Sequence, residues 1–443
     1  MELTTPTATA SALEYTPGVA GIIGLGYVGL PTAVAAARSG WHVLGFDIDA
    51  ERVERLNSGA SHVADVSDDD LSALIRLERF GATHDMTRLA ECDVVLICVP
   101  TPINQSKEPD LGPVIAAAQS VARALRPGQL IVLESTTYPG TTVEVVQPIL
   151  EASGLKAGQD FKLAFAPERL EPGNMRYKLT DIPKVVGGLT PECAQAAITF
   201  YGSFIKQIVP VSSPTAAEMV KIYENVFRCV NIAFVNELAL LCNRMGLDVW
   251  EVIEAASTKP YGFMPFYPGP GLGGHCIPVD PHYLAWKAKH YDFHVKFIEL
   301  AASINDNMPY FVCNRVASVL NEHRKCINGS RILVLGVTYK RDVADLRESP
   351  ALRIIELLSA RGGNVCYHDP YIPSLELTVK GRKVTFHSVP LSAELLRSAD
   401  CCVIVTDHSS YDWHFIAEHA PLIMDTRNAL KDIRAGVSHA YSF

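Results

Sequence analysis

Short apolar runs separated by polar or glycine-rich stretches fill the first half of the chain. Runs of this kind that end at turn residues are typical of buried strands in a parallel sheet. We expect such strands at residues 19–23, 41–46, 93–99, 129–134 and 162–166. An Ala-rich stretch at residues 30–40 predicts a helix, with Pro31 in its first turn, where proline is tolerated. This alternation predicts an α/β domain with a doubly wound sheet over residues 18–212.

A different period begins near Pro214. Apolar residues from Met219 to Phe234 recur every three or four positions, which predicts a long amphipathic helix. We expect further helices at residues 236–256 and 294–324. Residues 213–325 therefore form a central helical domain, and its apolar faces could form a subunit interface.

The short apolar runs return over residues 328–443. We expect strands at residues 331–336, 365–369, 401–406 and 422–425, and a helix that begins at Ser349-Pro350 and ends near Ala360. The strand–helix–strand order predicts a second Rossmann-like sheet. This sheet lacks a GxGxxG turn, so we expect it to bind something other than a dinucleotide.

The composition indicates which classes of binding partner and which compartment to expect. A net charge of -9 and the absence of a basic run argue against nucleic acid. No apolar run reaches the roughly 18 residues of a membrane span. Eleven scattered cysteines indicate reduced thiols, hence a cytoplasmic protein, and show no usual metal-ligand spacing. Residues 1–17 lack the features of a signal peptide and are expected to be a disordered tail.

The first candidate site is a glycine turn. Gly24, Gly26 and Gly29 form GxGxxG directly after a predicted strand, and Asp47 ends the next strand. In this arrangement the glycines let a pyrophosphate approach the helix N-terminus, and the acid binds the ribose hydroxyls. Asp47 would repel a 2′-phosphate, so we expect NAD rather than NADP.

The second candidate is a loop in which glycines precede a cysteine. Four glycines lie between Gly269 and Gly274, and His275, Cys276 and Asp280 follow. A thiolate is a strong nucleophile near neutral pH, and glycine permits close approach of a ligand. The alternative is a buried structural cysteine in a turn.

The remaining candidates each have two interpretations. Thr101, Ser135 and Thr136 follow predicted strands and could bind a ligand or cap a helix. Glu168 could be a base or substrate ligand, or pair with Arg169 at the surface. Lys221 and Asn225 are four residues apart on one predicted helix and could hold a substrate oxygen, or lie on a solvated face. Lys340 and Arg347 could bind phosphates, or be solvated charges in a loop.

These pieces together resemble the UDP-glucose/GDP-mannose dehydrogenase family, the nucleotide-sugar 6-dehydrogenases. The resemblance covers nearly everything after residue 18. It rests on the motifs GLGYVGLP (24–31), CVPTP (98–102), STTYPGTT (135–142), APER (166–169), AEMVKIYENVFR (217–228), GPGLGGHCIPVD (269–280) and GVTYKRDVADLRESP (336–350).

The resemblance implies roles for individual residues. Cys276 is the implied nucleophile, and the other implied catalytic residues are Lys221, Asn225, Asp280, Glu168 and Thr136. The implied NAD-binding residues are Gly24, Gly26, Tyr27, Val28, Gly29, Asp47, Arg52, Thr101, Thr136 and Arg347. The implied UDP-sugar-binding residues are Glu168, Arg169, Lys221, Asn225, Tyr267, Gly269, Gly273 and Lys340. The family commonly forms homodimers through its central helices.

Two departures concern the substrate. Members that act on UDP-glucose usually carry Phe and Lys where this chain has Arg169 and Val279. The forms found here resemble the branch acting on UDP-N-acetylhexosamines. Residues 280–289 are most similar to the UDP-N-acetylglucosamine members, with UDP-N-acetylmannosamine and UDP-glucose as alternatives. Arg169 is expected to bond the N-acetyl carbonyl. The product would be a uronic acid for polysaccharide biosynthesis.

Two other functions fit part of the chain. A hydroxyacid dehydrogenase of the 6-phosphogluconate type also has a Rossmann domain and a Lys-x-x-x-Asn helix, but it needs neither a thiol nor a third domain. A noncatalytic dinucleotide sensor would bind NAD without turning over any UDP-sugar. Cys276 and residues 328–443 argue against the former.

Overall fold

The computed structural model describes residues 17–443 except 64, 105, 171–176 and 275–276. Most of the predicted tail at residues 1–17 therefore lies outside the described residues. The chain divides into two compact units. Unit 1 comprises the described residues up to Glu224 together with His282–Phe293. Unit 2 comprises Asn225–Pro281 and His294–Phe443.

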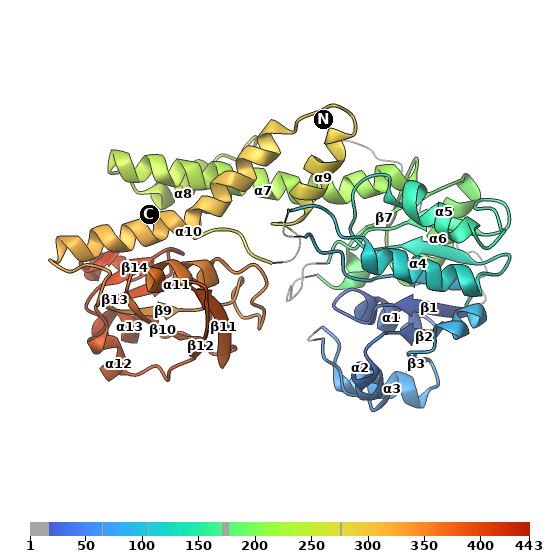
Figure 1. The fold of residues 1–443 in the computed structure, drawn as a ribbon, viewed down its shortest axis with the longest axis horizontal. Coiled ribbons are helices and arrows are strands. Elements are labelled where there is room, and N and C mark those ends of the chain that lie inside the picture. The colour runs from blue at the N-terminus through green and yellow to red at the C-terminus, as the bar shows by residue number, and fades with distance from the viewer. Residues whose placement is uncertain (1–16, 64, 105, 171–176, 275–276) are drawn as a thin grey trace. The chain divides into compact units, whose positions relative to one another are not determined.

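Unit 1 contains one sheet whose eight described strands have the order β3-β2-β1-β4-β5-β6-β7-β8 (Figure 1). Only the β6–β7 pair is antiparallel. The strands are β1 (Val19–Ile23), β2 (His42–Phe46), β3 (Phe80–Thr83), β4 (Val94–Ile97), β5 (Leu130–Leu133), β6 (Lys162–Phe165), β7 (Lys184–Gly188) and β8 (Ile208–Val211). Each strand predicted for this half is present.

The helices of unit 1 follow its strands. They are α1 (Gly29–Arg38), α2 (Ala50–Asn57), α3 (Asp68–Arg76), α4 (Gly112–Ala124), α5 (Gln147–Glu151) and α6 (Pro191–Gly202), with the short turns η1 (Met86–Glu91), η2 (Thr142–Val146) and η3 (Leu179–Asp181). Because β1 lies between β2 and β4, the chain reverses its direction across the sheet there. The carboxyl ends of β1 and β4 are thus the position where ligands bind in doubly wound sheets.

Unit 2 contains a second sheet, whose five described strands run parallel in the order β10-β9-β13-β14-β15. They are β9 (Arg331–Leu335), β10 (Asn364–His368), β13 (Cys401–Ile404), β14 (Ile423–Asp425) and β15 (Ala440–Tyr441). The hairpin β11 (Ser374–Val379) and β12 (Arg382–His387) is separate. The accompanying helices are α8 (Val249–Ser257), α10 (Lys296–Glu322), α11 (Pro350–Ala360), α12 (Ala393–Ser398), α13 (Trp413–His419) and the turn η4 (Arg434–Gly436).

Two helices belong partly to each unit. Helix α7 (Pro214–Met245) begins in unit 1 and continues into unit 2, and α9 (Asp280–Lys289) begins in unit 2 and continues into unit 1. The sequence predicts one helix over residues 236–256, and this is wrong in detail. Gly246 adopts a φ of 71° after α7, and the Asp248 side chain then caps α8 by accepting from the Trp250 N–H.

Helix α7 is long and apolar enough to cross a bilayer by length and composition alone. In its most apolar 18-residue window, 44% is buried inside the structure. Core helices of soluble proteins pass the same test, so this is weak evidence for a membrane span. The sequence expectation of no membrane segment stays a prediction.

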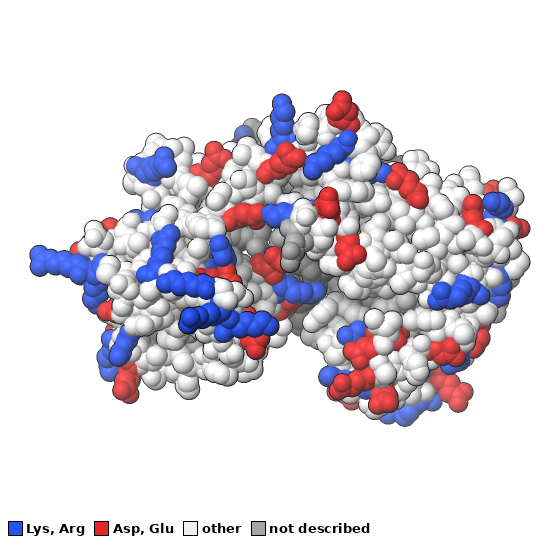
Figure 2. Space-filling model, in the orientation of Figure 1, with Lys and Arg blue, Asp and Glu red and all other residues white. Residues whose placement is uncertain are grey.

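The surface carries charges of both signs. Figure 2 shows Lys and Arg interspersed with Asp and Glu on the drawn face of each unit. Several of these charges form ion pairs with a residue three positions away, including Arg88 with Glu91 and Arg353 with Glu356. Exposed pairs of this kind contribute little stability, so the chemistry of interest lies with the buried charges.

Glu218 is one such buried charge, and it ties α7 to the loop after β5. Its carboxylate accepts from the N–H of Gly140 at 2.5 Å, and from the N–H and hydroxyl of Thr142 at 2.8 and 2.6 Å. Burial raises the pKa of Glu218 to about 7 despite these hydrogen bonds. The folded protein therefore holds a proton there between about pH 4.3, the ordinary glutamate value, and pH 7.

This raised pKa predicts how stability depends on pH. Because the folded state binds the extra proton, the contribution of Glu218 is fully present below about pH 4.3 and is lost as pH rises towards 7. We expect Glu218→Gln to remove this pH dependence, which totals about 3.7 kcal/mol in the free energy of unfolding. Chemical denaturation at pH 5, 6 and 7 measures the effect, with the exposed Glu192→Gln as control. Parallel wild-type and Glu218→Gln curves would contradict the assignment.

Candidate active site

The turn after β1 is shaped by its glycines. Gly24 has a φ of 91°, and a Cβ there would lie 2.6 Å from the carbonyl oxygen of Cys98. A Cβ at Gly29 would lie 1.9 Å from the Gly24 carbonyl oxygen, whereas one at Gly26 would meet nothing within 4 Å. Gly24 and Gly29 thus allow the turn to pack closely against β4 and α1, and Gly26 leaves open space for a ligand.

The same turn joins Asp47. Its buried carboxylate accepts from the Leu25 N–H at 3.0 Å and pairs with the Arg52 guanidinium at 3.0 Å. No side chain caps the N-terminus of α1 after Val28, so the positive end of that helix faces the turn. The glycine turn, this helix end and Asp47 fit NAD, and they are the residues that would hold its pyrophosphate and ribose. Tyr27, in the turn, is 41% exposed.

The loops after β4 and β5 are tied together. The Ser135 hydroxyl donates to the Val99 carbonyl at 2.8 Å, and the buried Tyr283 hydroxyl of α9 donates to the Thr101 carbonyl. Thr136 is half-buried. None of Thr101, Ser135 and Thr136 caps a helix among the described elements, so the alternative role that the sequence allows them is not seen.

Glu168 is held on both oxygens. One accepts from the N–H groups of Arg169 and Leu170 at 2.7 and 2.6 Å, and the other accepts from the buried Lys184 ammonium at 3.0 Å. Lys184 also pairs with buried Glu134 at 2.9 Å. Burial alone would raise the pKa of Glu168, but Lys184 and the Leu170 N–H hold it below its ordinary value. Glu168 is therefore a fixed anion.

Arg169 does not pair with Glu168 through its side chain. Two of its guanidinium nitrogens donate to Glu224 at 2.5 and 3.2 Å, and the third donates to the Pro183 carbonyl at 2.7 Å. All three nitrogens are thus engaged within unit 1. These bonds use three of the five guanidinium N–H groups, so the expected role as a donor for an N-acetyl carbonyl stays a prediction. Glu224 lies 55 residues away, and no local pattern indicates the pair.

Lys221 is the exception among the buried charges of unit 1. The residue is 8% exposed, and no described residue accepts a hydrogen bond from its ammonium or pairs with it. Its charge acts on Glu168, whose oxygens are already occupied. A buried ammonium without an acceptor is unfavourable unless a ligand supplies one, so Lys221 is a candidate donor for a bound oxygen.

In unit 2 the glycine loop packs against the loop after β9. A Cβ at Gly273 would lie 2.5 Å from the Tyr339 Cβ, and one at Gly274 would lie 2.9 Å from the Tyr339 ring. The Gly274 N–H donates to the Arg347 carbonyl at 2.8 Å, and the Gly269 N–H to Asn236 at 3.0 Å. Glycine is required there by the close approach of Tyr339, and the close approach of a ligand that the sequence suggests stays a prediction.

His275 and Cys276 lie outside the described residues. The described residue Asp280 follows them in unit 2. The buried Asn225 side chain donates to the Asp280 carboxylate at 2.5 Å. The structure therefore joins two of the residues that the sequence analysis singles out, as a buried amide–carboxylate pair.

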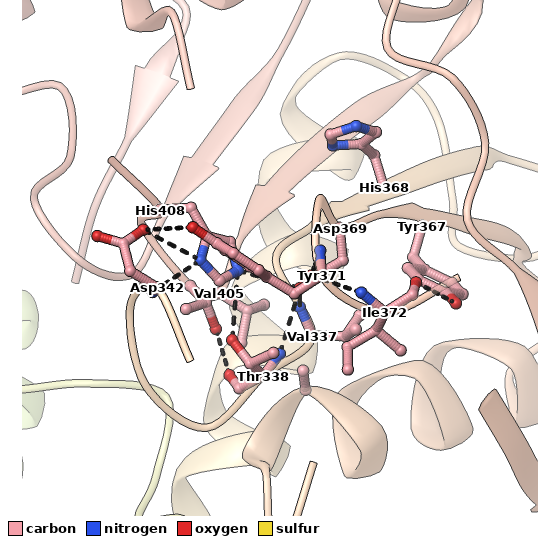
Figure 3. Close-up of polar contacts among 12 residues, drawn as sticks. Val337, Thr338, Asp342, Tyr367, His368, Asp369, Tyr371, Ile372, Val405 and His408 are labelled. Atoms are coloured by element: carbon pink, nitrogen blue, oxygen red, sulfur yellow. Dashed lines mark hydrogen bonds and ion pairs between the residues drawn. The ribbon is translucent and has the colours of Figure 1, made fainter. Parts of the chain in front are cut away.

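Lys340 lies on a loop fixed by a buried polar network (Figure 3). The Asp342 N–H donates to His408 Nδ1 at 3.0 Å, so the ring proton lies on Nε2, which faces Asp369 at 3.0 Å. The Thr338 hydroxyl donates to the Lys340 carbonyl at 2.9 Å. Burial alone would raise the pKa of Asp369, but His408 and backbone N–H groups hold it below its ordinary value.

Arg427 is a candidate site residue that is not identified from the sequence. It follows β14, and its Nε donates to the Val405 carbonyl at 2.9 Å. Among the described residues no carboxylate pairs with its guanidinium, which lies 2.9 Å from where a Gly269 Cβ would be. Burial and nearby Arg341 lower the pKa of Arg427 to about 10. Its only sequence signal is an Arg two residues after a predicted strand.

Two further predicted residues have other contacts. The Arg347 guanidinium donates to Asp345 at 2.6 to 3.0 Å and is 44% exposed. Tyr267 is 53% exposed and stacks on Trp250 with ring centroids 6.1 Å apart. Their roles in binding stay predictions.

Comparison with known proteins decides the family. Three domains of the UDP-glucose/GDP-mannose dehydrogenase family match in order: the NAD binding domain over residues 19–205, the central domain over 215–307 and the UDP binding domain over 333–432. The chain belongs to this family. It is an NAD-dependent nucleotide-sugar dehydrogenase, an oxidoreductase.

Individual relatives of this dehydrogenase are similar over most of its length. The UDP-N-acetyl-D-mannosamine dehydrogenase of Pyrococcus horikoshii is 37% identical over 94% of this chain and 96% of that protein. The UDP-N-acetyl-D-glucosamine 6-dehydrogenase of Pseudomonas aeruginosa is 38% identical over 79% of this chain and 82% of that protein. A solved UDP-D-ManNAc dehydrogenase structure from Pyrococcus horikoshii has a TM-score of 0.86 at 36% identity, covering 96% of this chain and 98% of that one.

The family places the dehydrogenase's two candidate half-sites. The NAD binding domain contains the glycine turn and Asp47, and the UDP binding domain contains the Lys340 loop and Arg427. In both domains these candidate residues follow the carboxyl ends of strands, and their roles in binding stay predictions.

The pairing of Asp47 with Arg52 predicts the cofactor preference of the dehydrogenase. Asp47→Ala removes the acceptor of the ribose hydroxyls and frees Arg52 to approach a 2′-phosphate. We expect the ratio of kcat/KM for NAD over NADP to fall at least about tenfold. The matched control is Asp49→Ala, because Asp49 also contacts Arg52, at 3.5 Å, but is exposed. Equal use of the two cofactors by the wild type would overturn this role.

Proposed function

We propose that the enzyme oxidises the C6 alcohol of UDP-N-acetylglucosamine to the uronic acid, and that the product enters polysaccharide biosynthesis. The observation that carries the chemistry is the buried Lys221 ammonium, which has no acceptor among the described residues. Alcohol and aldehyde oxidation both develop negative charge on the C6 oxygen. A preorganised donor for such an oxyanion contributes roughly 10²–10³ in rate.

The choice of an N-acetylhexosamine rests on similarity. The relatives above are named for UDP-N-acetyl-D-glucosamine and UDP-N-acetyl-D-mannosamine. The stretch at residues 280–289 supports the glucosamine epimer. A second candidate is UDP-N-acetylmannosamine, favoured by the relative that covers 94% of this chain.

The oxidation takes two steps on this enzyme. Bound NAD supplies the hydride acceptor in each. In the first step the alcohol loses its proton and C6 becomes an aldehyde, while Lys221 stabilises the developing oxyanion. The Cys276 thiolate then adds to the aldehyde carbon, giving a thiohemiacetal. Loss of the second hydride leaves a thioester, and water releases the uronate and restores the thiol.

Two carboxylates have distinct parts in this proposal. Asp280, held by Asn225 at 2.5 Å, is the base that takes the alcohol proton through a water. Glu168, which the sequence suggests as a base or substrate ligand, could act on the hydrolytic water. Its lowered pKa and its three hydrogen bonds make it a weak base, so we assign it to orienting that water.

Compartment and assembly remain predictions. Ten described cysteines are unpaired, consistent with a reducing cytoplasm. Exposed apolar side chains on α7 and α10, including Tyr223, Phe234 and Phe297, support the homodimer or higher homo-oligomer expected from the sequence.

A panel of UDP-sugars assayed with NAD tests the substrate. We expect kcat/KM for UDP-N-acetylglucosamine to exceed that for UDP-glucose at least about tenfold. Because all three guanidinium nitrogens of Arg169 are engaged with Glu224 and Pro183, Arg169→Phe should lower both values and keep their ratio.

Two outcomes would change the assignment. A wild type that prefers UDP-glucose contradicts the N-acetylhexosamine branch. A ratio that collapses in Arg169→Phe but not in Glu224→Gln returns Arg169 to the role of sugar selector.

A further inference from the structure

Three charged side chains lie buried at neighbouring strands of unit 1. Glu134 follows β5, Glu168 follows β6 and Lys184 begins β7, and these strands are adjacent in the sheet. The exposed fractions are 1% for Glu134, 7% for Glu168 and 4% for Lys184. Sheet order therefore brings together residues separated by up to 50 positions in the chain.

Lys184 is the centre of this triad. Its ammonium lies 2.9 Å from Glu134 and 3.0 Å from Glu168. Glu134 is satisfied further by the Tyr201 hydroxyl at 2.5 Å and the Cys98 thiol at 3.3 Å. Glu134 thus has donors on both oxygens and faces no open space, so its function within the triad is to hold Lys184.

A buried ion network is poor evidence for stability, because well-packed apolar side chains often do as well. The triad instead determines which groups donate hydrogen bonds to the Glu168 carboxylate. Lys184 occupies one oxygen of Glu168, and the backbone N–H groups of Arg169 and Leu170 occupy the other. The next cation that acts on Glu168 is Lys221, whose own ammonium has no described acceptor.

We propose that Lys184 is a positioning residue that satisfies Glu168 and so keeps the Lys221 ammonium available to the substrate oxygen. Without Lys184, Glu168 would be a buried anion lacking a cation on one oxygen, and Lys221 would move onto it. The role of Lys221 in this statement rests on the proposed function.

The first experiment is a structural one that needs no turnover. In a crystal structure of Lys184→Met, we expect the Lys221 ammonium within about 3 Å of a Glu168 oxygen. A Lys221 that stays unpaired in this variant, with Glu168 unmoved, overturns the proposal. Should Lys184→Met fail to fold, Lys184→Met with Glu134→Gln removes one charge of each sign and permits the same comparison.

The second experiment is a kinetic cycle with UDP-N-acetylglucosamine and NAD. Lys184→Met should lower kcat on the order of 10²-fold with a smaller change in KM, since the lost interaction is with the oxyanion. In a Lys221→Met background the same substitution should cost less than about threefold, because the donor it protects is absent. Lys184→Arg can pair with both acids and should restore kcat to within about tenfold of wild type.

The outcomes separate this inference from the proposed function. Multiplicative losses in the double variant, or an unchanged kcat in Lys184→Met, overturn the positioning role. A wild type that turns over no UDP-sugar overturns the proposed function instead, and the crystal structure of Lys184→Met still decides whether Lys184 keeps Lys221 from pairing with Glu168.

Discussion

A charge removed from water must meet an opposite charge or a hydrogen-bond donor or acceptor, and this constraint organises the whole site. In the described residues most buried charges meet it internally: Glu168 through Lys184, Glu218 through Gly140 and Thr142, and Asp280 through Asn225. Lys221 has no acceptor among the described residues, and Arg427 donates to the Val405 carbonyl but pairs with no described carboxylate. We expect a bound anion to supply what each of them lacks.

The two sheets apply one local design to two ligands. In each sheet, a glycine after the first strand packs against the end of a neighbouring strand. Gly24 after β1 packs against Cys98 after β4, and Gly336 after β9 packs against Thr406 after β13. In each, an acid after the second strand accepts from the residue following that glycine, Asp47 from Leu25 and Asp369 from Val337. Only Asp47 keeps an exposed partner; Asp369 is closed off by buried His408 (Figure 3). Asp369 is therefore engaged by the protein itself, whereas Asp47 lies beside the glycine turn.

Much of this could be predicted from the sequence because the signals are local. Apolar runs predict the central strands of both sheets, and glycine spacing predicts the turn at Gly24. Contacts that depend on the order of strands in the sheet could not be predicted from the sequence. Glu134 and Lys184 are unremarkable in sequence and meet only because β5, β6 and β7 are neighbours. Arg169 pairs with Glu224, which lies on a helix distant in the sequence. The break after α7 depended on a single Gly246 with positive φ, which the helical period alone did not indicate.

We propose that one active site, with its cysteine, carries the sugar from alcohol to acid without releasing the aldehyde. The most direct measurement is the amount of NADH formed per molecule of UDP-N-acetylglucosamine when the sugar is limiting and NAD is in excess. The account predicts two NADH for each sugar nucleotide consumed, with the uronate as product. One NADH per sugar nucleotide, with the reaction stopping at the aldehyde, would contradict it.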